Sequence, residues 1–282
     1  SENQPGFRFS AREPGSREFF EEVAAHRYSL EPAIKEMARF EDWRGRDVLE
    51  AGCGIGTDAV EFARAGARYT GIDMTPAAIA LARRRFSLEG LEGRLLEGSV
   101  TALPFPDSSF DLVYSNGVLH HVEDTERALG EIHRVLRPGG TALVMVYHRN
   151  SLNYRFTIMI VRRALAAVLV LPGAVRAVAR LTGESREVIE GHRRLIAEHG
   201  LAYLRDRALF LSNNTDGPGG VLSKVYSSAE GLEALRSFSA ARAEVRYLNL
   251  RLYPAGARIA GTKAGRRLER RYGWHLWLRA VK

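Results

Sequence analysis

The residues with the clearest chemical spacing form a glycine-rich turn, Glu50-Ala-Gly52-Cys-Gly54-Ile-Gly56, between an apolar segment and a helix-prone one. Glycines let the backbone turn tightly and approach a ligand closely, and the free amides of the helix that follows point at a polar group. Asp73 ends the next apolar segment, where a carboxylate can accept both hydroxyls of a ribose. The turn and the carboxylate together predict a cofactor that contains a nucleoside.

The residue after the third glycine separates two kinds of cofactor. A dinucleotide fingerprint places glycine at position 57, where this chain has Thr57, and this difference counts against a nicotinamide cofactor. Around the turn the chain resembles the class I S-adenosylmethionine (SAM) dependent methyltransferases, in particular the small-molecule enzymes of methyltransferase type 11. The resemblance covers about residues 45 to 147 and also rests on Leu103-Pro-Phe-Pro-Asp-Ser-Ser-Phe-Asp-Leu-Val, Leu119-His-His-Val and Arg134-Val-Leu-Arg-Pro-Gly-Gly140. A nicotinamide-dependent oxidoreductase stays as an alternative.

The resemblance implies roles for residues around the turn. Gly52, Gly54 and Gly56 would make room for the methionine part of SAM, Asp73 would hold the ribose, and Met74 would lie against the adenine. Tyr28 resembles a tyrosine that closes over the methionine end in some relatives. The other residues assigned to the cofactor are Glu50, Ser99, Val100, Ser115 and Asn116.

The chain departs from the family at one of these positions. In many relatives an aspartate after the third strand binds the adenine amino group, whereas the corresponding stretch here is Gly98-Ser99-Val100. Ser99 can form a hydrogen bond, but a charge-assisted contact is lost.

Methyl transfer is an in-line displacement in which the sulfonium already carries the reactivity. The protein must therefore align acceptor and methyl and, for a hydroxyl acceptor, remove a proton. His120 and His121 follow the predicted fourth strand and His148 ends the fifth, and imidazole titrates near neutral pH. Paired histidines at this place resemble those of sugar and natural-product O-methyltransferases. We predict these three histidines as catalytic candidates for an oxygen acceptor, with N-, S- or C-methylation of a small metabolite as alternatives.

Several absences narrow the acceptor. No Asn/Asp-Pro-Pro-Tyr tetrad, with which methyltransferases hold planar amino groups of adenine or glutamine, follows the predicted fourth strand. Cys53 is the single cysteine, so no second thiol can attack cytosine, and no acidic cluster between residues 115 and 148 could hold magnesium. We predict a metal-free enzyme that acts on a small molecule and not on nucleic acid.

The elements that position these residues alternate between apolar runs and helical stretches. This alternation predicts an α/β fold with a Rossmann-like, doubly wound and mostly parallel sheet, whose ligands lie at the carboxyl ends of the strands. A C-terminal antiparallel strand pair and a helical insertion after the fifth strand complete the prediction. The expected strands are 48–49, 69–72, 95–96, 110–114, 142–147, 243–252 and 274–281, and the expected helices are two within 16–40 broken at Pro32, then 57–65, 75–88, 124–136 and 228–238. The last two strands are expected to be joined by a loop.

The insertion raises the question of the acceptor. Residues 1 to 148 hold 17 Lys and Arg against 23 Asp and Glu, a net charge of −6, whereas residues 149 to 282 hold 24 against 10, a net charge of +14. Between Arg149 and Gly183 there are six arginines and no acid, interleaved with apolar residues. We expect a lid in which an arginine among Arg149, Arg155, Arg162 and Arg163 binds an acceptor anion, while a membrane-surface anchor and a dimer helix remain open. A polar loop over 212–220 and the residues after it add acceptor candidates, namely Asn213, Asn214, Asp216, Lys224 and Tyr226.

These observations divide the chain into four parts. We expect N-terminal helices that cover the cofactor (1–44), a SAM-binding Rossmann-like core (45–148), a helical lid (149–226), and a helix and strands that complete the sheet (227–282). One cysteine, no signal peptide in this sequence and no apolar run of about 20 residues favour a cytoplasmic protein without a membrane span. A homodimer and peripheral membrane contact stay open.

Overall fold

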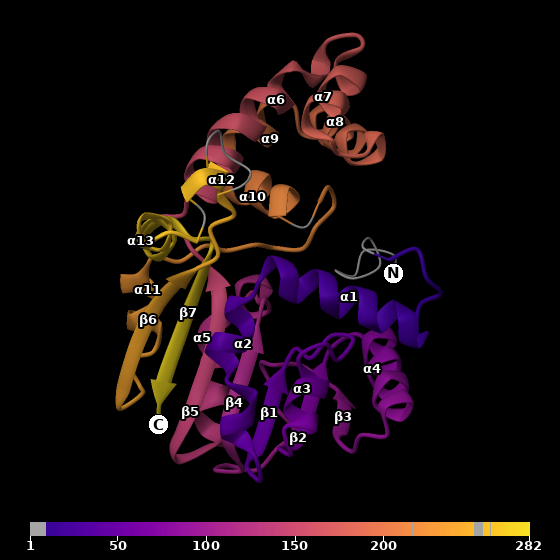
Figure 1. Cartoon of the computed structure of the whole chain (residues 1–282). Helices are drawn as coiled ribbons and strands as arrows, with labels where there is room; N and C mark the ends of the chain where they lie inside the picture. The colour runs from indigo at the N-terminus through magenta and orange to yellow at the C-terminus, as the bar shows by residue number, and fades with distance from the viewer. Residues whose placement is uncertain (1–9, 216, 251–255, 260) are drawn as a thin grey trace.

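The computed structural model describes residues 10–215, 217–250, 256–259 and 261–282. A seven-stranded sheet with helices on both faces forms the lower part of Figure 1, and a lobe of helices stands above one end of the sheet. No helix within the described ranges is long and apolar enough to cross a membrane.

The sheet has the order β3-β2-β1-β4-β5-β7-β6. Strands β1 to β5 are parallel, and β7 runs antiparallel between β5 and β6, so the predicted fold class and C-terminal pair are confirmed. The strands are β1 (Asp47–Ala51), β2 (Arg68–Asp73), β3 (Arg94–Glu97), β4 (Phe110–Asn116), β5 (Leu136–Tyr147), β6 (Ala240–Arg246) and β7 (His275–Val281).

Side chains alternate between two hydrophobic cores because the central strands are buried on both faces. Val113 and Val144 point to one core, whereas their neighbours Leu112 and Leu143 point to the other. Helix α5 (Thr125–Val135) covers the first face, and α2 (Ala33–Ala38), α3 (Ala59–Arg64) and α4 (Pro76–Glu89) cover the second. Continuous apolar runs are typical of parallel strands covered in this way.

The C-terminal part differs from the prediction in two details. Strand β6 starts at Ala240 and ends at Arg246, so it begins earlier and ends earlier than the predicted 243–252 segment, of which residues 251 and 252 lie outside the described ranges. The connection to β7 contains the helices α12 (Gly256–Ile259) and α13 (Lys263–Tyr272) where a loop was expected. Helix α13 is rich in arginine and poor in apolar residues, so hydrophobic periodicity did not reveal it. Helix α11 (Ser228–Ala234) precedes β6 and is capped by Ser227.

Two N-terminal helices lie beside the glycine turn. Helix α1 (Arg17–Leu30) runs across the carboxyl ends of the first strands in Figure 1, and α2 follows the predicted break at Pro32. The α1 side chains Phe19 and Phe20 pack against Ile55 of the glycine turn and against α4. The 3-10 helix η1 (Phe40–Trp43) leads from α2 to β1.

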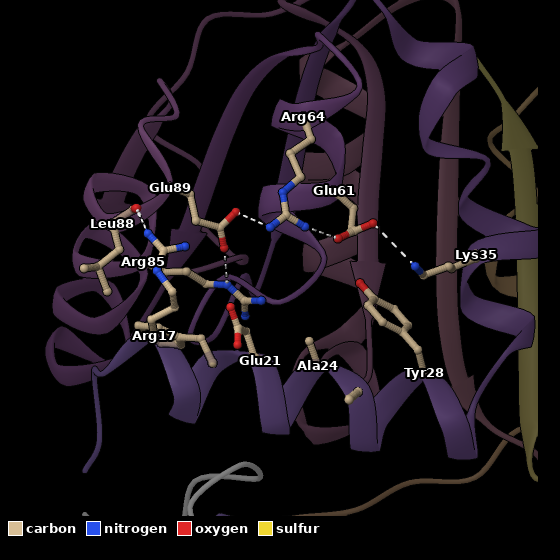
Figure 2. Close-up of a pocket in the computed structure, with 12 residues that line it drawn as sticks. Arg17, Glu21, Ala24, Tyr28, Lys35, Glu61, Arg64, Arg85, Leu88 and Glu89 are labelled. Atoms are coloured by element: carbon tan, nitrogen blue, oxygen red, sulfur yellow. Dashed lines mark hydrogen bonds and ion pairs between the residues drawn. The ribbon is translucent and has the colours of Figure 1, made fainter. Parts of the chain in front are cut away.

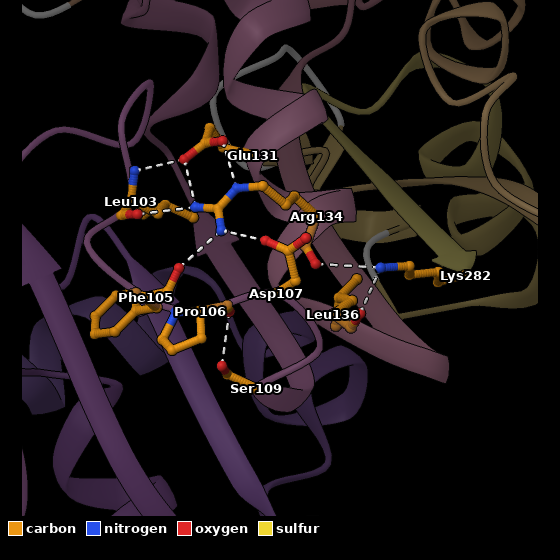
Figure 3. A network of polar contacts seen from close by, with 9 residues as sticks. All are labelled: Leu103, Phe105, Pro106, Asp107, Ser109, Glu131, Arg134, Leu136 and Lys282. Carbon is orange, nitrogen blue, oxygen red and sulfur yellow. Dashed lines mark hydrogen bonds and ion pairs between the residues drawn. The ribbon is translucent and has the colours of Figure 1, made fainter.

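Arg134 joins two of the motifs found in the sequence. Its guanidinium donates to the Leu103 carbonyl at 2.9 Å and the Phe105 carbonyl at 2.8 Å, and it pairs with Asp107 at 2.8 Å (Figure 3). Glu131 accepts from Arg134 and from the Leu103 N–H, each at 2.7 Å. The Leu103-to-Asp107 motif thus forms a loop that Arg134 holds against α5. This face of the sheet is opposite to the face covered by α3 and α4.

The insertion forms a helical lobe with its own hydrophobic core, built from buried residues such as Ile158, Ile189, Tyr203 and Phe210. Its elements are the π-helix η3 (Asn153–Arg162), α6 (Arg163–Ala167), the 3-10 helix η4 (Val168–Val170), α7 (Ala174–Thr182), α8 (Arg186–His199), α9 (Leu201–Arg205) and α10 (Arg207–Thr215). Helix α10 runs through Thr215, so the loop predicted from residue 212 was wrong at its start. The burial of Phe210 and Leu211 on this helix outweighs the loop-like composition that follows them.

Candidate cofactor and acceptor site

The glycine turn follows β1 and holds its three glycines in left-handed backbone conformations. Gly52 has a φ of +91°, Gly54 a φ of +51° and Gly56 a φ of +81°. A Cβ atom on Gly56 would stand 3.3 Å from Cβ of Ala82 on α4, so this glycine allows close packing of the turn against that helix. A Cβ atom on Gly52 would stand 2.3 Å from Cγ2 of Val118, whereas a Cβ atom on Gly54 would meet no atom within 4 Å. Gly52 therefore makes room for a side chain of the protein, while Gly54 faces open space beside the turn.

Asp73 supports the turn from the end of β2. Its Oδ2 accepts the Gly54 N–H and its Oδ1 accepts the Thr75 N–H, both at 2.9 Å. Each carboxylate oxygen can accept two hydrogen bonds, so each keeps capacity for a ribose hydroxyl. The next residue, Met74, is 77% exposed, which leaves its apolar surface available to an adenine ring.

Five polar side chains meet at the start of α3, and we call them the Asp58 cluster: Arg27, Tyr28, Asp58, Tyr114 and Asn116. Asp58 accepts the Tyr28 hydroxyl at 2.9 Å, the Tyr114 hydroxyl at 2.8 Å and the Asn116 Nδ2 at 3.2 Å, and Arg27 lies 3.1 Å away. Burial, reinforced by the Asp58 carboxylate, raises the pKa of Tyr28 and of Tyr114, so both phenols remain donors.

Asp58, Arg27 and Tyr114 were not predicted from the sequence. The available signal was an acid two residues after Gly56, at the N-cap of a helix, where negative charge is favourable. Arg27 and Tyr114 carry no such local signal, because only the packing of α1 on the sheet brings them to Asp58.

Asn116 provides the test of whether SAM fits here. Its Nδ2 donates to Asp58 and to the Tyr114 hydroxyl, while its Oδ1 is buried and has no hydrogen-bond partner in the described part of the chain. A buried acceptor without a donor is costly, and the ammonium group of a methionine moiety offers donors. With the open face of Gly54 and the spare acceptor capacity of Asp73, the residues present fit SAM.

Four other predicted cofactor residues lie around the turn. Glu50 is buried and accepts the Tyr69 hydroxyl at 2.6 Å, and burial, with Asp58 nearby, raises its pKa well above the usual range. Ser115 donates to the Ala51 carbonyl at 2.8 Å, which joins β4 to β1, and Val100 packs in the core. Ser99 is exposed, with its Oγ 2.8 Å from the Thr101 hydroxyl. The side chains of Glu50, Ser115 and Val100 are thus used inside the protein.

His120, the first of the predicted bases, is fully enclosed. Its ring centroid lies 3.7 Å from that of Tyr147 and 4.1 Å from that of His121, and neither ring nitrogen has a hydrogen-bond partner among the described residues. Burial, with a further contribution from His121, lowers its pKa well below 6.5. His120 is therefore a neutral imidazole beneath the site surface.

The other two histidines each hold Nδ1 against a backbone carbonyl. Nδ1 of His121 lies 2.8 Å from the Leu222 oxygen and Nδ1 of His148 lies 3.0 Å from the Gly273 oxygen. A carbonyl can only accept, so Nδ1 carries the proton and Nε2 the lone pair. His148 is buried, which lowers its pKa, whereas His121 is half-buried. His121 combines the tautomer and the access that a general base needs.

The lobe leaves the sheet and returns to it at the same place. The Tyr226 N–H donates to the Tyr147 carbonyl and the Arg149 N–H donates to the Tyr226 carbonyl, both at 2.8 Å. Just before this return, the Lys224 N–H donates to the His120 carbonyl at 2.8 Å. The last residues of the lobe therefore close over the ends of β4 and β5. The hydroxyl of Tyr226 lies 3.1 Å from the Thr125 hydroxyl.

A cleft of about 470 Å³ lies at the base of the lobe, and we call it the arginine cleft. Arg149 lines it and pairs with Glu230 at 2.6 Å. Arg155 and Arg207 are exposed in it, and neither has a carboxylate partner within the described ranges. Its other lining residues are Asn150, Tyr154 and Val225. Arg207 was not predicted, because it lies 24 residues beyond Gly183, the end of the basic segment.

The remaining acceptor candidates lie elsewhere. Arg162 pairs with Glu184 inside the lobe, and the Arg163 guanidinium lies 5.1 Å from the centre of the Phe210 ring, so these two arginines do not reach outward for an anion as expected. Asn214 is buried and donates to the Tyr203 hydroxyl at 3.2 Å. Asp216 lies outside the described residues.

A second cavity, of about 230 Å³, lies between α1, α3 and α4 and is lined by charged side chains (Figure 2). Its cations are already paired with groups of the chain. Arg64 bridges Glu61 and Glu89, Lys35 lies 3.6 Å from Glu61, and Arg17 donates to the Leu88 carbonyl. These contacts link the N-terminal helices to the core and use most of the cavity's cations within the protein.

Comparisons with known proteins agree with this geometry. A family described as a methyltransferase domain matches residues 49–144. A demethylmenaquinone methyltransferase of Thermus thermophilus is 45% identical over 82 residues, which are 29% of this chain and 37% of that protein. A fatty-acid O-methyltransferase of Mycolicibacterium smegmatis is 40% identical over 117 residues, 41% of this chain and 42% of that protein.

A solved structure extends the likeness in fold. The SAM-dependent methyltransferase from Mesorhizobium loti superposes with a TM-score of 0.50 at 20% identity, covering 89% of this chain and 96% of that one. The chain matches less than half the length of the two curated relatives named above. The matched domain favours SAM over the nicotinamide alternative. Residues 49–144 of this chain are a methyltransferase domain, built on the fold of the class I SAM-dependent methyltransferase family.

Proposed function

We propose that this protein transfers the methyl group of SAM to an oxygen atom of a small-molecule acceptor. The observation that carries the proposal is the unpartnered Asn116 Oδ1. It belongs to the Asp58 cluster at the carboxyl end of β4, and β1 and β2 present Gly54 and Asp73 at the same edge of the sheet. An activated sulfonium compound bound there has both a nucleoside and an amino-acid end to satisfy these groups.

The chain's own residues bind the cofactor, orient the acceptor and remove a proton from it. SAM, when bound, supplies a methyl group that is already activated for in-line displacement. Asp73 binds the ribose hydroxyls, and the Asp58 cluster with Asn116 binds the amino-acid end. His121 accepts the proton of an acceptor hydroxyl on Nε2, because its Nδ1 proton stays on the Leu222 carbonyl. His120 and His148 are buried, so they are not assigned this proton transfer.

The arginine cleft supports an acceptor that carries an anionic group. Arg155 and Arg207 present two guanidinium groups without carboxylate partners, at the base of an insertion that starts beside β5. Guanidinium groups bind carboxylates and phosphates through paired hydrogen bonds. The relative named as a fatty-acid O-methyltransferase takes a carboxylic acid as its substrate, and a carboxylate acceptor needs no base. Hydroxyl and carboxylate acceptors therefore differ in their need for His121.

Titration calorimetry with SAM and with NAD tests the cofactor. We expect micromolar binding of SAM that Asp73→Ala removes, while Asp42→Ala, a surface carboxylate, leaves it unchanged. Transfer of a tritiated methyl group to pools of hydroxylated and carboxylated small molecules tests the reaction. Tight NAD binding without SAM binding would indicate an oxidoreductase. SAM binding without transfer to any pool would indicate a non-catalytic protein, and labelled amines or thiols would indicate another acceptor atom.

A further inference from the structure

The lobe exposes large apolar side chains at the end that lies farthest from the sheet, around α6 and α7 in Figure 1. Val170 is 67% exposed, Leu171 59% and Leu181 75%, and Val168 is also exposed. We call these four residues the apolar tip. Exposed apolar side chains are common singly, but a group of them marks an interaction surface.

The apolar tip continues along one face of the preceding helical segment. Phe156, Ile160, Ala164 and Val168 recur every four residues and are all exposed, and Leu171 follows three residues later. The opposite face of the same segment is buried in the lobe's own core through Ile158, Ala166 and Leu169. The exposed face is therefore not needed for folding of the lobe.

The charges beside the apolar tip are all positive between residues 149 and 183. Arg176 and Arg180 lie on α7, are exposed, and have no carboxylate partner among the described residues. Two acids that follow α7 are already paired: Glu184, which precedes α8, pairs with Arg162, and Glu190 on α8 pairs with Arg193. Apolar side chains flanked by unpaired arginines match the boundary between acyl chains and anionic headgroups.

We propose that the apolar tip, with Arg176 and Arg180, docks the protein on the surface of an anionic lipid membrane. The apolar side chains enter the acyl boundary and the two guanidinium groups bind lipid phosphates. A second copy of this chain is a poorer occupant, because a two-fold interface sets each patch against itself and would bring the unpaired arginines of both copies together. This inference does not depend on the proposed methyl transfer.

Co-sedimentation of the full chain with lipid vesicles tests the proposal. We expect binding to vesicles of phosphatidylcholine mixed with phosphatidylglycerol, weak binding to phosphatidylcholine alone, and loss of binding at high salt. The double variant Val170→Ser/Leu171→Ser should lose binding to both. Each of Arg176→Gln and Arg180→Gln should weaken binding to the anionic vesicles by about fivefold.

Matched variants outside the lobe provide the controls. Leu232→Ser on α11 and Arg242→Gln on β6 remove an exposed leucine and an exposed arginine without a carboxylate partner, and both should bind vesicles as the parent does. Absence of binding to anionic vesicles would overturn the proposal, as would equal loss in the control variants. A dimer in light scattering that Val170→Ser/Leu171→Ser dissociates would assign the tip to self-association instead.

Discussion

The hydroxyl of Tyr28 lies 2.9 Å from Oδ1 of Asp58, so helix α1 is joined to the N-cap residue of α3. The Tyr28 hydroxyl oxygen also lies 3.1 Å from the Thr57 carbonyl oxygen, and the Lys35 ammonium lies 4.4 Å from the centre of the Tyr28 ring. Through Tyr28 the N-terminal helices hold the carboxylate that we place at the amino-acid end of SAM.

Replacement of Tyr28 by Phe should weaken SAM binding about tenfold, because it removes a hydrogen bond to a charged group and leaves Asp58 less well held. The ring stays in place, so the unfolding temperature should change little. Calorimetric titration with SAM measures the effect, and Tyr272→Phe on α13 is the control. An unchanged affinity would show that the Tyr28 hydroxyl does not support the cofactor site.

Alanine substitutions at Gly52 and at Gly54 should separate effects on SAM binding from effects on folding stability. Gly54→Ala should weaken SAM binding at least tenfold, because the new Cβ would enter the open space that we assign to SAM. The same substitution should cost about 1–2 kcal/mol of unfolding free energy, because alanine is strained in the left-handed backbone conformation. Gly52→Ala should destabilise the protein further through the contact with Val118, and Val118→Ala should restore part of that loss. Thermal unfolding and SAM titration measure both quantities. Normal SAM affinity in Gly54→Ala would remove this face of the turn from the site.

His121→Gln should lower kcat for a hydroxyl acceptor by about 10²–10⁴-fold, the usual contribution of a general base. SAM affinity should be unchanged, since His121 is not placed in contact with the cofactor. His133→Gln, on α5 beside Phe238, serves as the control. A carboxylate acceptor should be methylated equally by parent and variant. A loss of rate with a carboxylate would instead assign His121 to acceptor binding.

Arg155→Gln and Arg207→Gln should each raise KM for an anionic acceptor by about fivefold, a modest effect because both side chains are exposed to solvent. The kcat should stay near that of the parent, and added salt should raise the parent's KM toward that of the variants. Steady-state kinetics with Arg242→Gln as control measures this. An effect on kcat alone would not agree with an anion site in the arginine cleft.

The protein should lose stability as pH falls below about 6.5, in part through His275. Burial, reinforced by Arg27, lowers the pKa of His275 to about 3. Between pH 6.5 and 3 the unfolded chain binds the proton and the folded chain does not, so acid favours unfolding by about 2 kcal/mol at pH 5 for this group. His275→Gln should flatten the dependence of unfolding free energy on pH, which denaturant unfolding at several pH values measures. Equal slopes for parent and His275→Gln would contradict the assignment.

The parts of the fold that sequence predicted are those with a local signal. Alternating apolar runs located β1 to β5, and Thr75 followed by Pro76 located the start of α4. Helix α13 was missed because Lys263–Tyr272 has little apolar periodicity, although Thr262 caps it through the Gly265 N–H. Asn213 and Asn214 suggested a loop by composition, but they lie on α10, where Asn213 donates to the Leu209 carbonyl.

The site was predicted unevenly for the same reason. Gly52, Gly54 and Asp73 lie in short motifs, whereas the Asp58 cluster collects side chains from three elements and depends on tertiary packing. The paired histidines were visible in sequence, but their different access was not. His120 is enclosed only because Tyr147 packs on it and Lys224 returns beside it.

Because residues 148 and 226 form a bridge at the end of β5, the lobe has adjacent points of departure and return. Without the lobe, a linker would have to span only the distance between two paired backbone segments. The pairing of β5 with β4 and with β7 uses no residue of the lobe. The lobe can therefore be exchanged without rebuilding the sheet. A short linker, or the corresponding insertion of a relative, could replace it while leaving the glycine turn and Asp73 in place, and a graft meant to change the acceptor would have to keep Leu222, whose carbonyl holds Nδ1 of His121.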